Sequence, residues 1–283
     1  MRHALTLADP SFIFNSSPAG RVADWAIRCQ KNGAVSSPSA ATIATMVTFY
    51  TALDAANLIP KFRALNCFVP DSLIATLTPL IIGSGLDPWT NHNFVAGDLI
   101  SNGLKGANTK YLEIGVNPST DLSTNSAGVT TYWRGVVPGE ATVDFGCDDG
   151  TNFFVYQHKY SDDRHYWDCW NQTNDNGRLW VAVDIDGWGY FSANRTAADK
   201  STLYEARSNV SFRAMKTVTG TTIGTPPNYP VFLFTVNSSG TPDTRYSTKT
   251  LSFTAVHDGL THTEAFNLYS AVQALQVAFG RSV

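Results

Sequence analysis

The first apolar positions of the chain recur with a helical period. Four of them share one face of a helix that ends at Asn32-Gly33, a common helix C-terminus: Val22, Ala23, Ala26 and Ile27. Ser37-Pro38 then has the pattern of an N-cap followed by proline at the first helical position. A second helix is predicted from there to about Asn57, with Pro60 as its boundary, from apolar residues at three- and four-residue steps: Ile43, Met46, Val47, Tyr50 and Leu53.

From Phe62 onward the period of the apolar residues changes to that of strands. Aromatic and β-branched runs are separated by Gly, Pro, Asn or Asp. The predicted strands are 62–69, 110–116, 128–134, 141–147, 152–159, 164–170, 178–184, 189–193, 202–206, 211–218, 230–236 and 251–257. Their spacing leaves no room for the crossover helices of a parallel sheet, so the pattern predicts a mainly β, antiparallel sandwich.

Two further segments complete the predicted organisation. Residues 79–110 are rich in Gly, Asn and Asp and are predicted to form an ordered long loop. A closing helix is expected at 261–280, because Thr261 and Glu264 form a capping box before an apolar stripe of Phe266, Tyr269, Val272, Leu275 and Phe279. We therefore expect an N-terminal segment, 1–61, whose two helices serve docking or assembly, and a sandwich over 62–283.

Composition excludes several classes of protein. Of 283 residues, 43% are hydrophobic and only 15% charged, which is too apolar for a disordered chain. The net charge of −3 and the absence of any Lys/Arg cluster argue against nucleic acid as a partner. No run of about 18 apolar residues and no signal-peptide pattern at the start are present, so we expect cytoplasmic synthesis without membrane insertion.

The cysteines give no metal or redox motif. Cys29, Cys67, Cys147 and Cys169 show neither C-x-x-C spacing nor histidines at zinc-like intervals, so no metal and no cofactor are predicted. Buried free thiols are the favoured interpretation. A Cys147–Cys169 bridge between neighbouring strands stays open for a protein that matures in an oxidising compartment.

Three stretches carry a resemblance to a known family: "FVAGDLISNGLKGANTKYLEIGVNPS" (94–119), "GYFSANRT" (189–196) and "LSFTAVHDGLTHTEAFNLYSAVQALQ" (251–276). In this order the chain resembles the concanavalin A-like, laminin-G-like jelly-roll domains of phage tail, fibre and other virion-associated proteins, and the helical lead-in resembles the segment before such jelly rolls. The resemblance covers about residue 20 to the end. It implies two face-to-face antiparallel sheets, entered by 110–116 and left by 251–257, and no catalytic residue.

Asp184 and Asp186 are the main candidates for catalysis. They alternate in "VAVDIDGWGY", so in a strand both carboxylates would project from one face, as a retaining glycosidase or a calcium site requires. Asp-Gly after a strand is also an ordinary hairpin signal, and we favour that interpretation.

The densest aromatic stretch indicates a ligand surface. Tyr166, Trp167, Trp170, Trp180, Trp188 and Tyr190 lie among Asp168, Asn171 and Gln172. Sugar rings stack on aromatic faces while their hydroxyls bond amides and carboxylates, although alternate strand positions should point into the core. The candidate ligand-binding residues are Trp167, Trp170, Asp184, Asp186, Trp188 and Tyr190.

The histidines form no recognised nucleophile motif, and G-x-S-x-G is absent from the sequence. His257 is predicted to make a structural hydrogen bond, and His158 and His165 are predicted at the surface beside a hairpin.

These observations favour a non-enzymatic structural or adhesion protein, expected in a virion as a fibre, baseplate or decoration protein, with a jelly roll that binds glycans. Expected partners are other virion or surface-assembly proteins and further copies of the chain, with the N-terminal helices as the contact surface. The alternatives are a glycosidase or depolymerase that uses Asp184 and Asp186, and an architectural protein without a ligand. For location, the alternatives to the virion are the bacterial surface and the cytoplasm.

Overall fold

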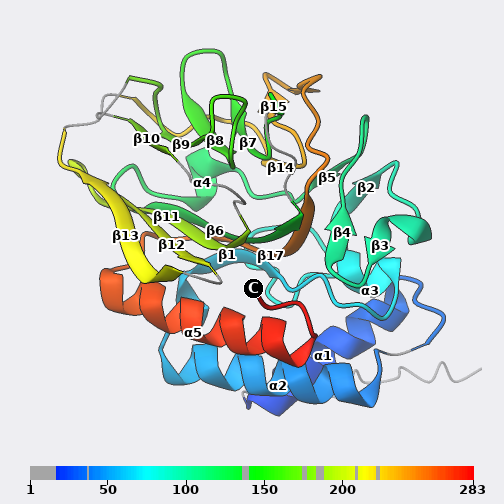
Figure 1. Ribbon diagram of the computed structural model, residues 1–283. Coiled ribbons are helices and arrows are strands. Elements are labelled where there is room, and N and C mark those ends of the chain that lie inside the picture. The colour runs from blue at the N-terminus through cyan, green and yellow to red at the C-terminus, as the bar shows by residue number, and fades with distance from the viewer. Residues whose placement is uncertain are drawn as a thin grey trace, which may run out of the picture.

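The protein forms three layers, which a computed structural model describes for residues 17–36, 38–135, 140–173, 177–182, 188–207, 210–220 and 224–283. A layer of helices covers one face of a β-sheet, called here the inner sheet, and a second sheet, the outer sheet, packs on its opposite face (Figure 1). This mainly β sandwich with N-terminal helices and a C-terminal helix confirms the predicted fold class.

The two N-terminal helices begin at serine caps. Helix α1 (Pro18–Lys31) starts after Ser17, whose side chain accepts a hydrogen bond from the backbone of Gly20. Helix α2 (Ala40–Ala55) starts after Ser39, whose Oγ accepts from the Thr42 nitrogen at 3.2 Å. The prediction of Pro38 at the first helical position was wrong by two residues, since Ser39 supplies the cap oxygen; Ser37 lies outside the described residues.

The inner sheet joins strands that are distant in sequence. In spatial order it contains β13 (Val210–Val218), β12 (Lys200–Arg207), β11 (Gly189–Ala197), β6 (Ala127–Gly135), β17 (Thr250–His257), β4 (Gly103–Lys105) and β3 (Leu99–Ile100), with β1 (Phe62–Asn66) also paired to β17. The final strand is β17, as the resemblance implied. The first is β1, because 62–66 pairs with β17, so the sandwich is entered earlier than 110–116.

The outer sheet is built mainly from the middle of the chain. Its order is β10 (Arg178–Ala182), β9 (Arg164–Cys169), β8 (Phe153–Gln157), β7 (Phe145–Asp148), β14 (Phe232–Leu233), β5 (Tyr111–Glu113) and β2 (Thr90–His92), with β15 (Asn237–Ser238) and β16 (Thr241–Pro242) beside β7. Short helices η1 (Ile59–Lys61), α3 (Leu73–Leu77), η2 (Ala96–Asp98) and α4 (Pro118–Asp121) lie in the connections.

The segment 79–110 is more than a loop. It contributes β2 to an edge of the outer sheet and β3 and β4 to an edge of the inner sheet. These strands are two or three residues long, too short to show the alternation by which strands are recognised in a sequence.

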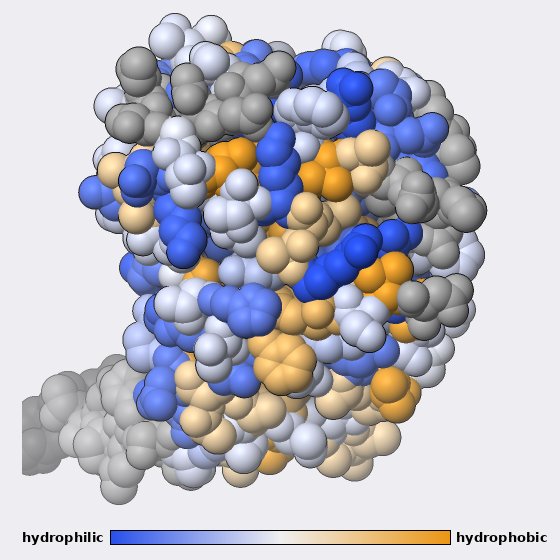
Figure 2. All heavy atoms as spheres, turned by 60° about the vertical axis from the view of Figure 1, so that its left-hand side comes forward, coloured by the Kyte–Doolittle hydropathy of each residue, from blue (hydrophilic) through white to orange (hydrophobic). Residues whose placement is uncertain are grey.

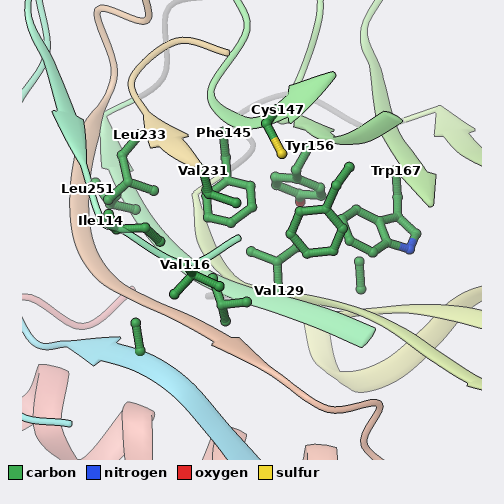
Figure 3. Close-up of a cluster of buried hydrophobic side chains, with 14 of the residues drawn as sticks. Ile114, Val116, Val129, Phe145, Cys147, Tyr156, Trp167, Val231, Leu233 and Leu251 are labelled. Carbon is green, nitrogen blue, oxygen red and sulfur yellow. The ribbon is translucent and has the colours of Figure 1, made fainter. Parts of the chain in front are cut away.

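The main core fills the space between the sheets. Figure 3 shows Val129 of β6, Phe145 of β7 and Trp167 of β9 meeting there, with Ile114 and Leu251 beside them. Each of these side chains is at most 1% exposed. Because residues two apart in a strand share a face, this core fixes which positions of each outer-sheet strand point to solvent.

A second core lies between the inner sheet and the helices. Tyr132, Tyr190 and Phe253 of the sheet pack with Trp25 of α1 and Phe49 of α2. The N-terminal helices are therefore part of the folded sandwich, and their apolar sides are buried within it.

The closing helix α5 (His262–Ala278) begins as predicted. Thr261 Oγ1 accepts from the Glu264 nitrogen, and the Glu264 carboxylate accepts from the Thr261 nitrogen, which confirms the capping box. The predicted stripe was displaced around the helix: Phe266 is 47% exposed, and the buried face consists of Ala265, Leu268, Ala271, Val272, Leu275 and Gln276. Val272 and Leu275 of the predicted stripe are therefore buried as expected, whereas Phe266 is not.

Candidate functional site

The candidate site is a pocket of about 260 Å³ at the outer sheet. It lies over β7, β8, β9 and β10, on the side that faces away from the main core, and the long helices α1, α2 and α5 lie on the other side of the molecule (Figure 1). Its floor is apolar, formed by Val143, Val155 and Val236 with Phe153 packed against them.

Strand register brings the polar groups of the pocket together. Gln157 of β8 lies opposite Tyr166 of β9, and Val155 lies opposite Asp168, which in turn lies opposite Arg178 of β10. These positions alternate with core residues such as Phe154 and Trp167 and therefore share the solvent side of the sheet. The rim is completed by Asp148, Tyr160, Gln172 and Arg245.

A two-bond ion pair holds one side of the rim. Arg178 Nε and Nη2 donate to the Asp168 carboxylate at 2.6 and 2.7 Å. Asp168 is buried, and the hydrogen bonds to it raise the pKa of Arg178. The same guanidinium lies 5.0 Å from the centre of the Tyr166 ring. Arg178 is thus fixed by a carboxylate on one side and an aromatic ring on the other.

Two tyrosines and a second arginine also line the rim. The Tyr160 and Tyr166 rings meet edge to face, 6.1 Å apart, and the Tyr166 hydroxyl donates to Asp162 at 2.5 Å. Arg245 Nε and Nη2 donate to Asp243 at 3.0 and 2.6 Å, and these bonds lower the pKa of the Asp243 carboxyl. The aromatic rings are therefore oriented before any ligand arrives.

Gln157 is the polar group that these internal bonds leave available. Its side chain is largely buried in the pocket wall, and within the described part of the chain its amide bonds to no other protein group. An amide offers two donor hydrogens and an acceptor oxygen, so Gln157 can bond adjacent hydroxyl groups of one ligand.

The predicted aromatic surface does not form as expected. Trp167 and Trp170 are fully buried: Figure 3 shows Trp167 between the sheets, and Trp170 Nε1 donates to the Thr124 carbonyl at 2.8 Å. Tyr190 is buried on the helical side of the inner sheet, where its hydroxyl donates to the Ala265 carbonyl. These three side chains present no ring face to solvent. The strand positions of Trp167 and Tyr190 point into the two cores, and Trp170, which follows β9 with a positive φ of 76°, is packed into the main core.

Of the three remaining predicted residues, one lies at the surface and two lie outside the described residues. Trp188 is 37% exposed, with the Arg134 guanidinium 5.5 Å from its ring centre. Asp184 and Asp186 lie outside the described residues. Of the candidates that the structure describes, Trp167, Trp170, Trp188 and Tyr190, none lines the pocket.

A clear signal for the pocket was nevertheless present in the sequence. Tyr166 and Gln172 belong to the aromatic stretch that was predicted to bind a ligand. The tryptophans chosen from that stretch, Trp167 and Trp170, are buried, whereas Tyr166 and Gln172 line the pocket. In β9 the alternate positions Tyr166 and Asp168 carry polar groups and lie on the pocket side of the sheet, and in β8 Gln157 is the polar residue on that side. Arg245 could not be found in this way, because it comes from a distant loop.

The positions of two histidines differ from those expected from the sequence. His158 and His165 are fully buried, contrary to the surface position expected. Their rings lie 4.3 Å apart and contact Phe191, and burial holds the pKa of His165 well below its usual value. His257 makes the predicted structural bonds, to Thr130 Oγ1 and the Asp258 carbonyl, both at 2.8 Å.

The four cysteines are buried free thiols, as favoured from the sequence, and Cys147 and Cys169 are not bridged. Burial raises the pKa of Cys29 to about 11, which keeps this thiol protonated at neutral pH. No three His, Cys, Asp or Glu side chains in the described ranges gather as a metal site. Among the same residues, no helix has the length and apolarity to cross a membrane.

Neither a family model nor a curated protein matches the sequence. Among solved structures, an arabinofuranosidase complexed with arabinofuranosyl-α-1,2-xylobiose matches with a TM-score of 0.44 and 10% identity over 61% of this chain and 40% of that one. The CBM40 of the Ruminococcus gnavus IT-sialidase, bound to α2,6 sialyllactose, matches with a TM-score of 0.41 and 10% identity, over 58% of this chain and 96% of that one. A point mutant of the NanB sialidase of Streptococcus pneumoniae matches with a TM-score of 0.40 and 12% identity, over 56% of this chain and 26% of that one. The chain thus spans 40% of the length of the arabinofuranosidase and 26% of the length of the NanB sialidase.

Proposed function

We propose that this protein is a non-enzymatic glycan-binding protein whose binding site is the outer-sheet pocket. The observation that supports the proposal is the combination of an apolar floor, Val143, Val155 and Val236, with an oriented polar rim. A sugar ring has an apolar C–H face and a hydroxyl-rich edge, and this floor and rim suit the two. A volume of about 260 Å³ accommodates one or two sugar residues, which fits recognition of a chain end.

Replacing Gln157 with Ala is expected to weaken glycan binding about tenfold, because it removes the amide that is free to bond ligand hydroxyls. A glycan array followed by calorimetry on the bound glycan measures the change. Asn267→Ala, which removes an amide from α5 on the other side of the molecule, is the matched control and should bind as the parent does. Retention of no glycan by the parent on a broad array would contradict the proposal.

The same incubations separate binding from hydrolysis. The proposal predicts that bound glycans are recovered intact. The alternative, a glycosidase or depolymerase, predicts release of reducing ends that is lost in Asp186→Asn.

We also propose that the protein assembles with copies of itself through the outward face of α2 and α5. These helices pack against each other, and residues 40–53 and 265–280 contain no Asp, Glu, Lys or Arg. Between them lies a groove of about 260 Å³ with Phe49 and Leu275 among its lining residues and alanines on both sides. Figure 2 shows pale orange and near-white side chains, weakly hydrophobic to intermediate in hydropathy, at the level of these helices, with some blue polar side chains among them. A second copy brings no charge to this contact, so neither copy would bury an unpaired ion.

The double variant Ala52→Glu with Ala274→Glu is expected to convert an oligomer into a monomer of 30.8 kDa, because the new carboxylates would face each other across the contact. Light scattering during gel filtration at micromolar concentration measures the mass. Ser211→Glu, at an exposed position of β13, should leave it unchanged. A monomeric parent would rule out the contact.

The placement in a virion, as a fibre, baseplate or decoration protein, rests on the sequence resemblance. It remains a proposal that the position of the protein in purified particles would test.

A further inference from the structure

We infer that the outer-sheet pocket selects neutral sugars over sugars that carry a carboxylate. The inference rests on the proposed glycan binding and concerns the charge of the ligand. It follows from how the charged groups of the pocket are already paired.

Both guanidinium groups at the rim are neutralised within the protein. Arg178 gives two hydrogen bonds to Asp168, and Arg245 gives two to Asp243, each along the Nε–Nη2 edge that would otherwise grip a ligand carboxylate. To bond this edge, a uronic or sialic acid would have to displace a carboxylate that is covalently part of the protein and already in place.

The third carboxylate of the rim opposes an anion directly. Asp148 lines the pocket and is nearly buried, and its Oδ1 accepts from the Gly150 nitrogen at 3.1 Å and the Ser238 hydroxyl at 3.2 Å. With two arginines and three aspartates, the pocket and its paired groups carry a formal net charge of about −1, so an anionic sugar gains no attraction.

The groups that remain suit hydroxyls. The Gln157 amide donates and accepts, and the Asp148 carboxylate accepts from O–H donors. Neutral hexoses present adjacent hydroxyls that can serve both, while the apolar floor covers the ring face. The preference is therefore set by pairing inside the protein.

The test compares matched oligosaccharides that differ only at C6, one series with hydroxymethyl groups and the other oxidised to uronates. The parent is expected to bind the neutral series at least about tenfold more tightly, with little change in affinity between low and high salt. Asp243→Asn frees one edge of Arg245 and is expected to shift the ratio of the two affinities severalfold toward the uronate. Asp98→Asn, whose partner is Lys110 at a distant edge, is the control and should leave the ratio unchanged.

Tighter binding of the uronate by the parent, weakened by salt, would overturn the inference while glycan binding stands. Binding of neither series, nor of any array glycan, would overturn both the inference and the proposed function.

Discussion

Asp144→Asn is expected to lower the free energy of unfolding by about 3–5 kcal/mol, the largest effect that we predict for one substitution. Asp144, just before β7 of the outer sheet, and Lys249, just before β17 of the inner sheet, form an ion pair with both side chains fully buried. Lys249 Nζ lies 2.8 and 2.7 Å from the two carboxylate oxygens. Without the carboxylate, the ammonium would stay buried, and among the described residues the Thr142 hydroxyl, 3.0 Å from Nζ, would be its remaining hydrogen-bond partner.

The Asp144 carboxylate also organises neighbouring chain segments. It accepts from the Ser247 hydroxyl at 2.5 Å and from the His158 nitrogen at 2.6 Å. An amide at position 144 can accept at one oxygen only, so one of these bonds is lost together with the ion pair.

Urea unfolding measures the change. The double variant Asp144→Leu with Lys249→Met should recover much of the loss, because removing both charges leaves no uncompensated ion. Asp162→Asn breaks a solvent-exposed pair with Arg164 and should cost about 1 kcal/mol or less. A change below 1 kcal/mol for Asp144→Asn would show that water or relaxation compensates the ammonium.

The stability of the protein is expected to fall by roughly 3 kcal/mol from His257 alone as the pH is lowered from about 6.5 to about 4. Burial lowers the pKa of His257 from 6.5 to about 4. The folded state therefore keeps this imidazole neutral, whereas the unfolded chain takes up a proton near pH 6.5. The stability that the neutral His257 contributes is fully present above pH 6.5 and is lost as the pH falls toward 4. Below about pH 4 both states bind the proton, and the free energy of unfolding changes no further through this group.

The hydrogen bonds of His257 explain why the neutral form is required. The Asp258 carbonyl can only accept, so Nδ1 carries the proton and Nε2 accepts from the Thr130 hydroxyl. A proton on Nε2 would oppose that hydroxyl in a fully buried site beside Ser192. Burial lowers the pKa of His165 in the same direction, so both histidines favour unfolding in acid.

Urea unfolding at several pH values measures how steeply the free energy of unfolding depends on pH. His257→Gln, which cannot take up a proton, is expected to show a shallower loss between pH 6.5 and 4, whatever its stability at neutral pH. His262→Gln, at the exposed start of α5, should keep the parent's slope. An unchanged slope in His257→Gln would show that another group governs the acid response.

The local patterns of the sequence were sufficient for the long helices and the long strands, although not for the short strands within 79–110. The T-x-x-E box fixes the start of α5 because both partners of its reciprocal bonds lie within four residues. Aromatic and β-branched runs identified the long strands, such as β6, β9 and β17, for the same reason: these signals depend only on neighbours in the chain. They also predicted the sandwich.

Tertiary structure alone decided which side chains of each strand point into the core. In β9, the alternating residues His165, Trp167 and Cys169 point into the core, and Tyr166 and Asp168 lie on the opposite face of the sheet, where the pocket is. The sequence contains both sets, and both include an aromatic residue, so alternation alone cannot say which set is buried. Packing of Trp167 against Phe154 makes that choice, and it turns Tyr166 toward the pocket.

What the sequence determined by itself was a mainly β sandwich with helices at both ends, because secondary structure and capping are local. What only the tertiary structure decided was the pocket, because Gln157, Arg178 and Arg245 meet through strand register and a loop 67 residues after Arg178 in sequence (245 − 178). Local periodicity contains no information about such distant contacts, and the free energy that brings these residues together comes from burying the core on the opposite side of the same strands.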